Sequence, residues 1–254
     1  MAALIEKVGD MKMRNGVLTI LLSLMWVPAQ AETYKVGVED IDYYPVYTTR
    51  DGQYSGFAKD LLDMFAEAHG HKFEYKAYPI ARLIGTFVEG QVDFKFPDNP
   101  NWAGDAKKGK TVHYSEPAQP YTDGTLVLPK HKGKGLDALG KLGIVRGFTP
   151  WDYLGSIEQG KVQLNEVSNV EAMINLGLSE RVGGVYFNVD VARHVLAEQL
   201  KKPGGLVFDD TLPHTRSQYH LSTIKHPELI EQFNVWLVAN ADKVEKLRKQ
   251  YGLN

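Results

Sequence analysis

An alternation of strand-like and helix-like segments limits the possible folds of this chain more than any other feature. Residues 34–38 alternate apolar and polar side chains, as a strand does, and residues 57–69 place apolar side chains three and four positions apart, as a helix does. The pattern then predicts a strand at 71–77, a helix at 80–89 and a strand at 92–96. This β-α-β-α-β order is typical of a parallel sheet that is covered by helices.

A polar loop separates this block from a second block of the same kind. Residues 96–110 are rich in Pro, Gly and Asn, and a loop of this length usually carries function. After the loop, the pattern predicts strands at 125–128, 142–145, 182–187 and 218–224, and helices after Pro150 and at 170–178, 189–200, 227–239 and 241–252. We therefore expect two α/β lobes.

The N-terminus has the features of a secretory signal peptide. Lys12 and Arg14 precede an apolar run at residues 17–27, and residues 29–31 form a small-x-small cleavage site. A membrane anchor is the alternative, but the run falls far short of the ~20 residues that a spanning helix needs.

The predicted signal peptide takes up residues 1–31, so the mature protein begins at Glu32. Residues 1–10 carry acidic side chains that a signal peptide does not need, which makes Met11 and Met13 alternative starts.

Composition favours a freely diffusing periplasmic protein. The chain has no cysteine, so it has no disulfide and no thioether-linked lipid tether. Its formal net charge is −2 over 254 residues, with both signs interspersed along the sequence. Nucleic acid and membrane surfaces are therefore excluded as partners, and we expect a monomer.

Four stretches of the sequence resemble a known family. They are KVGVEDIDYYPVY at 35–47, DGQYSGFAKDLLDMF at 51–65, LIGTFVEGQVDF at 83–94 and HPELIEQFNVWL at 226–237. Their order, with the Gly56-Phe57 pair and the Gly-x-Val-Asp step at residues 90–93, is similar to the extracellular solute-binding proteins of family 3. That family is the polar amino acid class that serves ABC importers.

The resemblance implies the type II periplasmic binding protein fold, in which two α/β lobes are joined by two extended hinge crossovers. Lobe 1 would comprise residues 34–122 plus 220–254, and lobe 2 residues 123–219. The crossovers would lie near 123–127 and 216–221. A small ligand would bind in the cleft between the lobes.

The sequence departs from the amino acid binders of the family in three places, one of which is Ala58, where an acid is common. Their loop after the Gly-x-Val-Asp strand ends in an arginine that clamps the ligand's α-carboxylate, but residues 96–110 contain no arginine. The family aspartate that receives the α-amino group corresponds here to either Asn188 or Asp190. These departures leave the chemical class of the ligand open.

Aromatic residues are the first candidates for contact with a ligand. Tyr43, Tyr44 and Tyr47 lie in the loop after the first strand, at the carboxyl end where ligands bind in open α/β sheets. Trp102 lies with Asp98 in the polar loop. Aromatic walls suit a ring or a cationic group; the alternative is that one or two of the tyrosines pack beneath the loop.

Two arginines are candidates for holding an anion. Arg146 begins a Gly turn in which Thr149 is expected to cap a helix that starts at Pro150 and Trp151, so that free backbone N–H groups would face an anionic group. Arg82, near the start of the predicted helix 80–89, either points into the cleft or pairs with a surface carboxylate. If the ligand is anionic, Arg82 and Arg146 would hold it from opposite lobes.

The sequence gives no sign of catalysis, of a cofactor or of a metal. It has no GxSxG or Walker motif and no cysteine nucleophile, and its eight histidines lack metal-ligand spacing. A dehydratase that resembles this fold would need a cleft carboxylate with a raised pKa, such as Glu39 or Asp98.

We therefore expect a non-enzymatic binding protein that captures a small polar metabolite, an amino acid or a related compound, for an ABC permease. A periplasmic sensor that docks on a membrane receptor is the alternative.

Overall fold

The computed structural model describes residues 32–253, so the predicted signal peptide lies outside the described residues. Ala31–Asn254 forms one compact unit. No helix within residues 32–253 combines the length and the apolar character that a membrane span requires.

The first half of the sheet confirms the predicted β-α-β-α-β order. Strand β1 (Thr33–Glu39) pairs in parallel with both β2 (Lys72–Tyr78) and β3 (Phe94–Asp98), and α1 (Phe57–Ala68) and α2 (Ile80–Val88) connect the three strands. The strand β3 begins two residues later than predicted, because the chain still bends at Val92 and Asp93.

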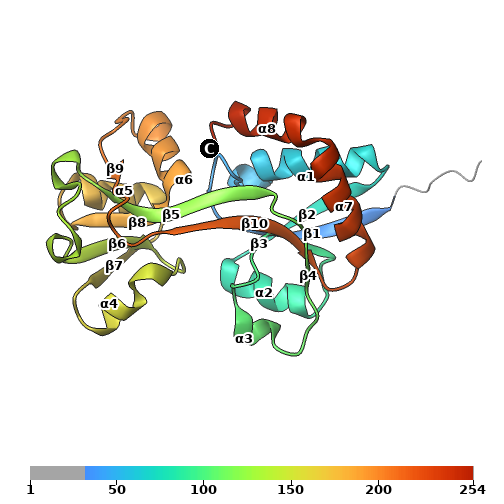
Figure 1. The fold of residues 1–254 in the computed structure, drawn as a ribbon, viewed down its shortest axis with the longest axis horizontal. Coiled ribbons are helices and arrows are strands. Elements are labelled where there is room, and N and C mark those ends of the chain that lie inside the picture. Colours follow the sequence, from blue (N-terminus) through green and yellow to red (C-terminus); the bar gives the residue numbers. More distant parts are fainter. Residues whose placement is uncertain (1–31, 254) are drawn as a thin grey trace, which may run out of the picture. The chain divides into compact units, whose positions relative to one another are not determined.

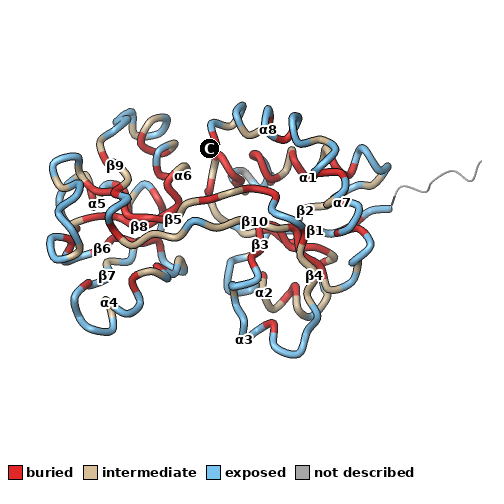
Figure 2. The backbone as a smooth tube through the Cα atoms, in the orientation of Figure 1, coloured by how far each residue is buried: buried red, intermediate tan, exposed pale blue. Residues whose placement is uncertain are grey.

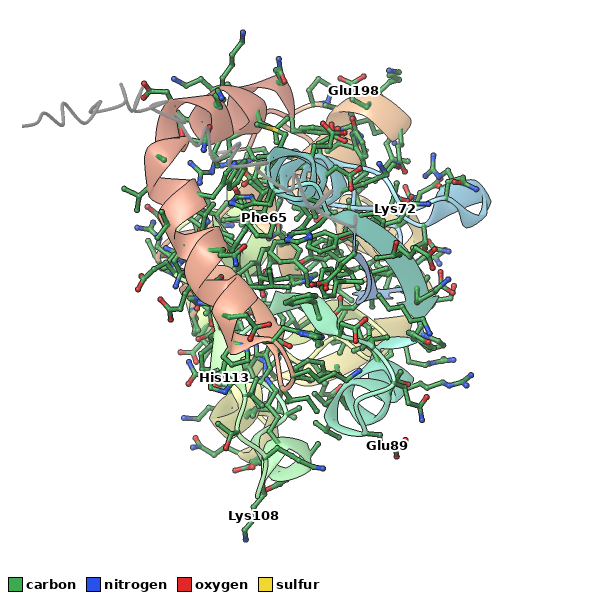
Figure 3. The ribbon with its side chains drawn as sticks, turned by 90° about the vertical axis from the view of Figure 1, so that its right-hand side faces the viewer. Phe65, Lys72, Glu89, Lys108, His113 and Glu198 are labelled. Atoms are coloured by element: carbon green, nitrogen blue, oxygen red, sulfur yellow. The ribbon has the colours of Figure 1, made fainter. Side chains whose placement is uncertain are left out.

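Helix α1 forms because its apolar residues fall on one side. Leu61, Leu62 and Phe65 are fully buried, and Phe65 lies in the interior in Figure 3, while charged side chains such as Lys108 project outwards. Gly56 begins the helix with φ 106°, and a Cβ atom there would come within 2.8 Å of the Tyr47 Cα. Only glycine fits this entry without strain.

The second half of the sheet repeats the parallel arrangement. In this half β6 pairs in parallel with β7 and β8, and β8 pairs antiparallel with β5. The bounds are β5 (Gln119–Val127), β6 (Lys141–Val145), β7 (Gln163–Val167) and β8 (Gly184–Asn188) for the strands, and α4 (Leu154–Glu158), α5 (Val170–Leu178) and α6 (Val189–His194) for the helices. A π-helical turn, Val195–Gln199, continues α6, so the predicted helix at 189–200 is confirmed as two segments.

Two long strands connect the halves (Figure 1). Strand β10 (Thr215–Thr223) pairs antiparallel with β3 near one end and with β5 near the other, and β5 pairs with β8. The strand order is therefore β2-β1-β3-β10-β5-β8-β6-β7. This is the two-lobed arrangement with two extended connections; the residue bounds of the lobes stay a prediction.

The remaining elements are short or lie near the C-terminus. They are α3 (Gly104–Lys107), β4 (His113–Tyr114), β9 (Val207–Phe208), α7 (Pro227–Ala239) and α8 (Ala241–Gln250). Helix α7 has the predicted bounds, and α8 confirms the predicted tail helix. Burial follows the strands and the inward sides of the helices, so that β3 and β8 are buried along their whole length (Figure 2).

Candidate ligand-binding site

A cavity of about 320 Å³ lies where strands from both halves of the sheet end. Glu39 is the last residue of β1 and Asp98 the last residue of β3, and both line the cavity, as does the turn at residues 147–149 that follows β6. The central strands add Asp123 from β5 and Tyr219 from β10. The carboxyl ends of the strands are the expected place for a ligand in a sheet of this kind.

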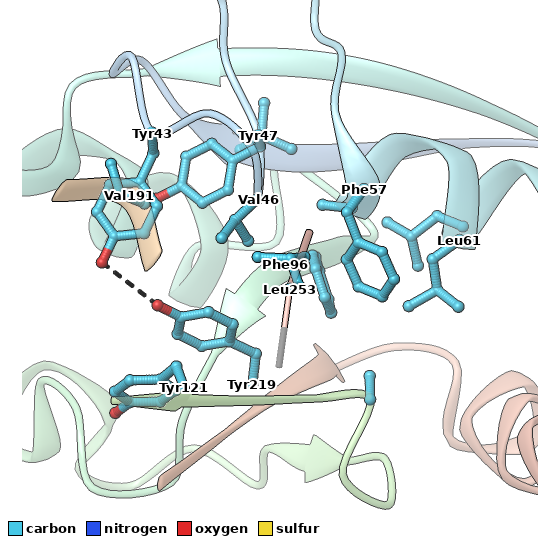
Figure 4. Packing of buried hydrophobic residues seen from close by; sticks show 14 of the residues in the cluster. Tyr43, Val46, Tyr47, Phe57, Leu61, Phe96, Tyr121, Val191, Tyr219 and Leu253 are labelled. Atoms are coloured by element: carbon cyan, nitrogen blue, oxygen red, sulfur yellow. Dashed lines mark hydrogen bonds between the residues drawn. The ribbon is translucent and has the colours of Figure 1, made fainter. Parts of the chain in front are cut away.

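Tyrosines form one wall of the cavity. Tyr43 and Tyr47 stack with ring centroids 5.1 Å apart, and the Tyr43 hydroxyl lies 3.4 Å from the Tyr219 hydroxyl (Figure 4). Tyr219 stacks on Tyr121 at 4.2 Å and contacts Trp102 at 5.9 Å. The structure thus brings the predicted residues Tyr43, Tyr47 and Trp102 together at one cavity.

Asp98 is neutralised by its own neighbours. Its Oδ1 atom lies 3.2 Å from the Lys95 Nζ and 3.0 Å from the Lys107 Nζ, and its Oδ2 accepts a hydrogen bond of 2.7 Å from Ser222 Oγ. Burial opposes ionisation, but the two ammonium groups outweigh it and hold the pKa of Asp98 below its usual value. Asp98 therefore lacks the raised pKa that a dehydratase acid at this position would need.

Glu39 and Asp123 differ from Asp98, because burial dominates their titration. Desolvation raises the pKa of Glu39, although Lys95 and a hydrogen bond from the Tyr47 hydroxyl oppose the shift. Burial likewise raises the pKa of Asp123 to about 8; a contact with Asn188 opposes this shift, and the charges of Asp152 and Glu39 add to it.

Asp123 also carries an unsatisfied atom. Its side chain is 8% exposed, and its Oδ1 has no hydrogen-bond partner among the described residues. From the sequence alone, Asp123 is only the start of a crossover and Glu39 only a possible acid. An acidic residue in an otherwise uncharged strand, beside a glycine, was the available signal for Asp123.

The turn after β6 places Thr149 and Trp151 at the cavity but does not cap a helix. A 3-10 turn begins at Trp151 with Pro150 in the capping position, and no side chain accepts a hydrogen bond there. The prediction that Thr149 caps a helix is therefore wrong, because Pro150 takes that position itself. Trp151 is 53% exposed at the edge of the cavity.

The two predicted arginines do not belong to the described lining of this cavity. The Arg146 Nε lies 3.9 Å from Glu166 Oε2 in an exposed ion pair, and Arg146 lines a neighbouring, more polar cleft. The Arg82 guanidinium lies over the Tyr78 ring, 5.6 Å from its centroid. The structure does not bring the two arginines to one site, and their ligand role stays a prediction.

Tyr44 and Asn188 have structural contacts outside the described lining. The Tyr44 ring packs 4.7 Å from His194 and 6.0 Å from Tyr251. The Asn188 Oδ1 accepts hydrogen bonds of 3.1 Å from the backbone N–H groups of Asp190 and Val191, which caps α6. No observation tests a ligand role for either residue.

Comparisons with known proteins agree with this geometry. Residues 34–254 match the profile of the bacterial extracellular solute-binding proteins, family 3. No curated protein matches the chain at a significant level.

Three solved structures illustrate the range of similar folds. An ancestral amino acid-binding protein, a precursor of cyclohexadienyl dehydratase, is 22% identical with a TM-score of 0.65, over 86% of this chain and 94% of that chain. An arginine transport system periplasmic binding protein from Legionella pneumophila is 15% identical with a TM-score of 0.64, over 87% and 100%. A histidine kinase sensor domain is 16% identical with a TM-score of 0.66, over 86% and 95%. These likenesses show the shared fold, and the profile match over residues 34–254 shows that the chain belongs to family 3 of the bacterial extracellular solute-binding proteins.

Proposed function

We propose that this protein captures a small polar metabolite, an amino acid or a related compound, in the periplasm and delivers it to an ABC permease. One observation carries the proposal: a cavity of about 320 Å³ at the carboxyl ends of strands from both halves of the sheet. This volume lies within the range of ~300–1,000 Å³ that is usual for small-molecule sites. Membership of the solute-binding family supports a binding role.

A ligand in this position would touch both halves at once. Glu39 and Tyr43 belong to the first half, while Phe148 and Thr149 belong to the second. Binding would therefore favour a closed arrangement over an open one, because only the closed arrangement offers both sets of contacts. In this proposal, the permease would distinguish the loaded protein from the empty one by its closed arrangement.

A periplasmic sensor is the second candidate, because a histidine kinase sensor domain has a similar fold. A sensor would use the same cavity and would differ only in its membrane partner. Co-purification of the liganded protein from membranes, with permease subunits or with a receptor, distinguishes the two roles.

A dehydratase is a weaker candidate. The pKa of Glu39 is raised by burial, as an acid catalyst at this site would require. However, a cyclic prephenate-like acid is an anion, and the sole cationic side chain in the described lining, Lys95, already contacts Asp98. Mass spectrometry of a bound compound after incubation tests this function, since turnover would yield a product of lower mass.

Thermal-shift screening of a metabolite library tests the binding role. A compound at ~100 times its dissociation constant stabilises the folded state by ~2.7 kcal/mol, which raises the melting temperature measurably. We expect at least one small polar compound to do so without being converted. A library of polar metabolites that produces no shift at all would contradict the proposal.

A further inference from the structure

We propose that the cavity takes an organic cation without a carboxylate, such as a small amine or guanidinium compound, with its charged group against Glu39 and Asp123. This inference rests on the proposed binding function and names the chemical class of the ligand.

The lining of the cavity carries more carboxyl groups than amino groups. It holds three carboxyl groups, those of Glu39, Asp98 and Asp123, and one amino group, that of Lys95. Lys95 and Asp98 lie within 3.2 Å of each other, and Lys107 adds a second cation to Asp98 from outside the lining. No ion pair within residues 32–253 involves Glu39 or Asp123, and Lys95, whose charge acts on Glu39, forms its ion pair with Asp98.

Asp123 offers the ligand a carboxyl oxygen, Oδ1, and the other polar group that acts on this carboxyl group is the Asn188 side chain. The residue is 8% exposed and lines the cavity, and its Oδ1 has no hydrogen-bond partner among the described residues. A buried acceptor without a partner is unfavourable, whereas one paired with a charged donor is strongly stabilised. An ammonium or guanidinium N–H group at this position would donate to Oδ1 and would favour the ionised form of the carboxyl group.

The aromatic residues around the two acids suit the same ligand. The Tyr47 hydroxyl donates a hydrogen bond to Glu39, Tyr43 stacks on Tyr47, and Tyr219 lines the cavity together with Asp123. Trp102 already has the Lys95 ammonium 5.4 Å from its ring, so this wall accommodates a positive charge. Ring faces attract cations and offer large apolar contacts to their carbon stems.

An anionic group finds no equivalent partner. Arg82 and Arg146 lie outside the described lining, and Lys95 is engaged with Asp98 and with the Pro97 carbonyl oxygen. Once ionised, Glu39 and Asp123 would repel a carboxylate at close range. The site therefore selects against zwitterions and acids as well as for cations.

Isothermal titration calorimetry with matched probes tests the charge preference. The cations are 2-phenylethylamine, tyramine, putrescine and agmatine. The neutral and anionic counterparts are 3-phenylpropanamide and 3-phenylpropanoate, and arginine and glutamate represent amino acids. We expect the tightest probe to be a carboxylate-free cation, at least about tenfold tighter than its neutral counterpart and than either amino acid.

Isosteric variants test whether Glu39 and Asp123 hold the charged group of the ligand. Glu39→Gln and Asp123→Asn keep the shape of the site and remove the carboxylates, so each should weaken binding of the cation by about thirtyfold or more. Asp137→Asn and Glu158→Gln remove exposed acids elsewhere on the second half of the sheet and serve as matched controls with unchanged affinity. Melting temperatures of the unliganded variants confirm that each one is folded.

The outcomes separate this inference from the binding function. Tighter binding of the amide, of the acid or of an amino acid overturns the cation site but leaves a binding protein. Failure of every cation probe, or wild-type affinity in both Glu39→Gln and Asp123→Asn, also overturns it. Only the absence of any hit in the wider metabolite screen counts against the binding function itself.

Discussion

Asp123 links the site to the stability of the unliganded protein. Its pKa is about 8 in the folded state, mainly because the side chain is buried, whereas an aspartate in an unfolded chain titrates near 3.9. Asn188, Asp152 and Glu39 act on the group from three other elements. Between these two pH values, the folded state binds more protons than the unfolded state, so its stability falls as pH rises.

The first prediction follows from this decrease in stability with rising pH. The free energy of unfolding should decrease from pH 5 to pH 8 and level off above pH 8, with an Asp123 contribution on the order of a few kcal/mol. In Asp123→Asn this decrease should be smaller, although Glu39 still contributes in the same direction. Urea unfolding at both pH values measures it, with Asp137→Asn as the control. An unchanged decrease in Asp123→Asn would disprove the assignment.

Asp98 should contribute to the stability of the fold, because its carboxylate is the counter-charge of two buried ammonium groups. Asp98→Asn should lower the free energy of unfolding by ~3–5 kcal/mol at neutral pH, because Lys95 and Lys107 then lose their buried counter-charge. Chemical denaturation measures this loss. A fully stable Asp98→Asn variant with impaired ligand binding would instead make Asp98 a ligand contact.

The arginines give a third prediction. If the ligand is a cation, Arg82→Ala and Arg146→Ala should keep its affinity within about threefold, because neither arginine belongs to the described lining of the cavity. Calorimetry with the tightest cationic probe checks this. A loss of ~2–5 kcal/mol in both variants would favour an anionic ligand held from both lobes.

At the scale of elements, the long periodic segments could be predicted and the polar ones could not. Helix α7 has the predicted bounds because Pro227 and its apolar face mark it clearly. Strand β7 was missed because its five residues are mostly exposed, so no apolar pattern marks it. Strand β10 begins at Thr215, earlier than predicted, because its first residues are polar and pair with β5 through the backbone.

The site was harder to predict than the elements that hold it. Tyr43 and Tyr47 follow the first strand directly, so their place at its carboxyl end was accessible from sequence. Two cations contact Asp98. Lys95 lies in the same strand, β3, whereas the position of Lys107 depends on the path of the loop. The surroundings of Asp123 depend on β8 and β10, which pair with its own strand β5 at this residue, and no local pattern encodes this pairing.

The entry to α1 gives a prediction at this scale. Gly56→Ala should lower the free energy of unfolding by ~1–3 kcal/mol, because an L residue is strained at φ 106° and its Cβ would press on the Tyr47 backbone. Thermal denaturation measures the loss. Gly70→Ala is the control, since it has a similar positive φ of 70° but no neighbour within 4 Å, and it should cost less.

At the scale of the whole molecule, the two halves share β5 and β10, so a rearrangement of the halves must pass through these strands. Their pairing runs from Thr215 opposite Asp123 to Tyr219 opposite Gln119. Asp123 and Tyr219 therefore lie on the connections themselves as well as at the cavity. A ligand that contacts them is placed where it can bias the angle between the halves.

The mature protein should begin at Glu32 and be released in soluble form into the periplasm. The Ala-x-Ala step at residues 29–31 and the absence of cysteine lead to this expectation. N-terminal sequencing of the periplasmic fraction measures it. An uncleaved chain recovered with the membrane fraction would show that the N-terminus is an anchor.

The positions of the tryptophans have an optical consequence. The chain contains four, and two of them, Trp102 from the first half of the sheet and Trp151 from the second, line the same cavity. Trp236 is buried in α7, 6% exposed, and Trp26 falls within the predicted signal peptide. Capture of a ligand therefore changes the surroundings of two indoles and leaves the third as an internal reference, so the intrinsic emission of the unlabelled protein reports occupancy of its cavity.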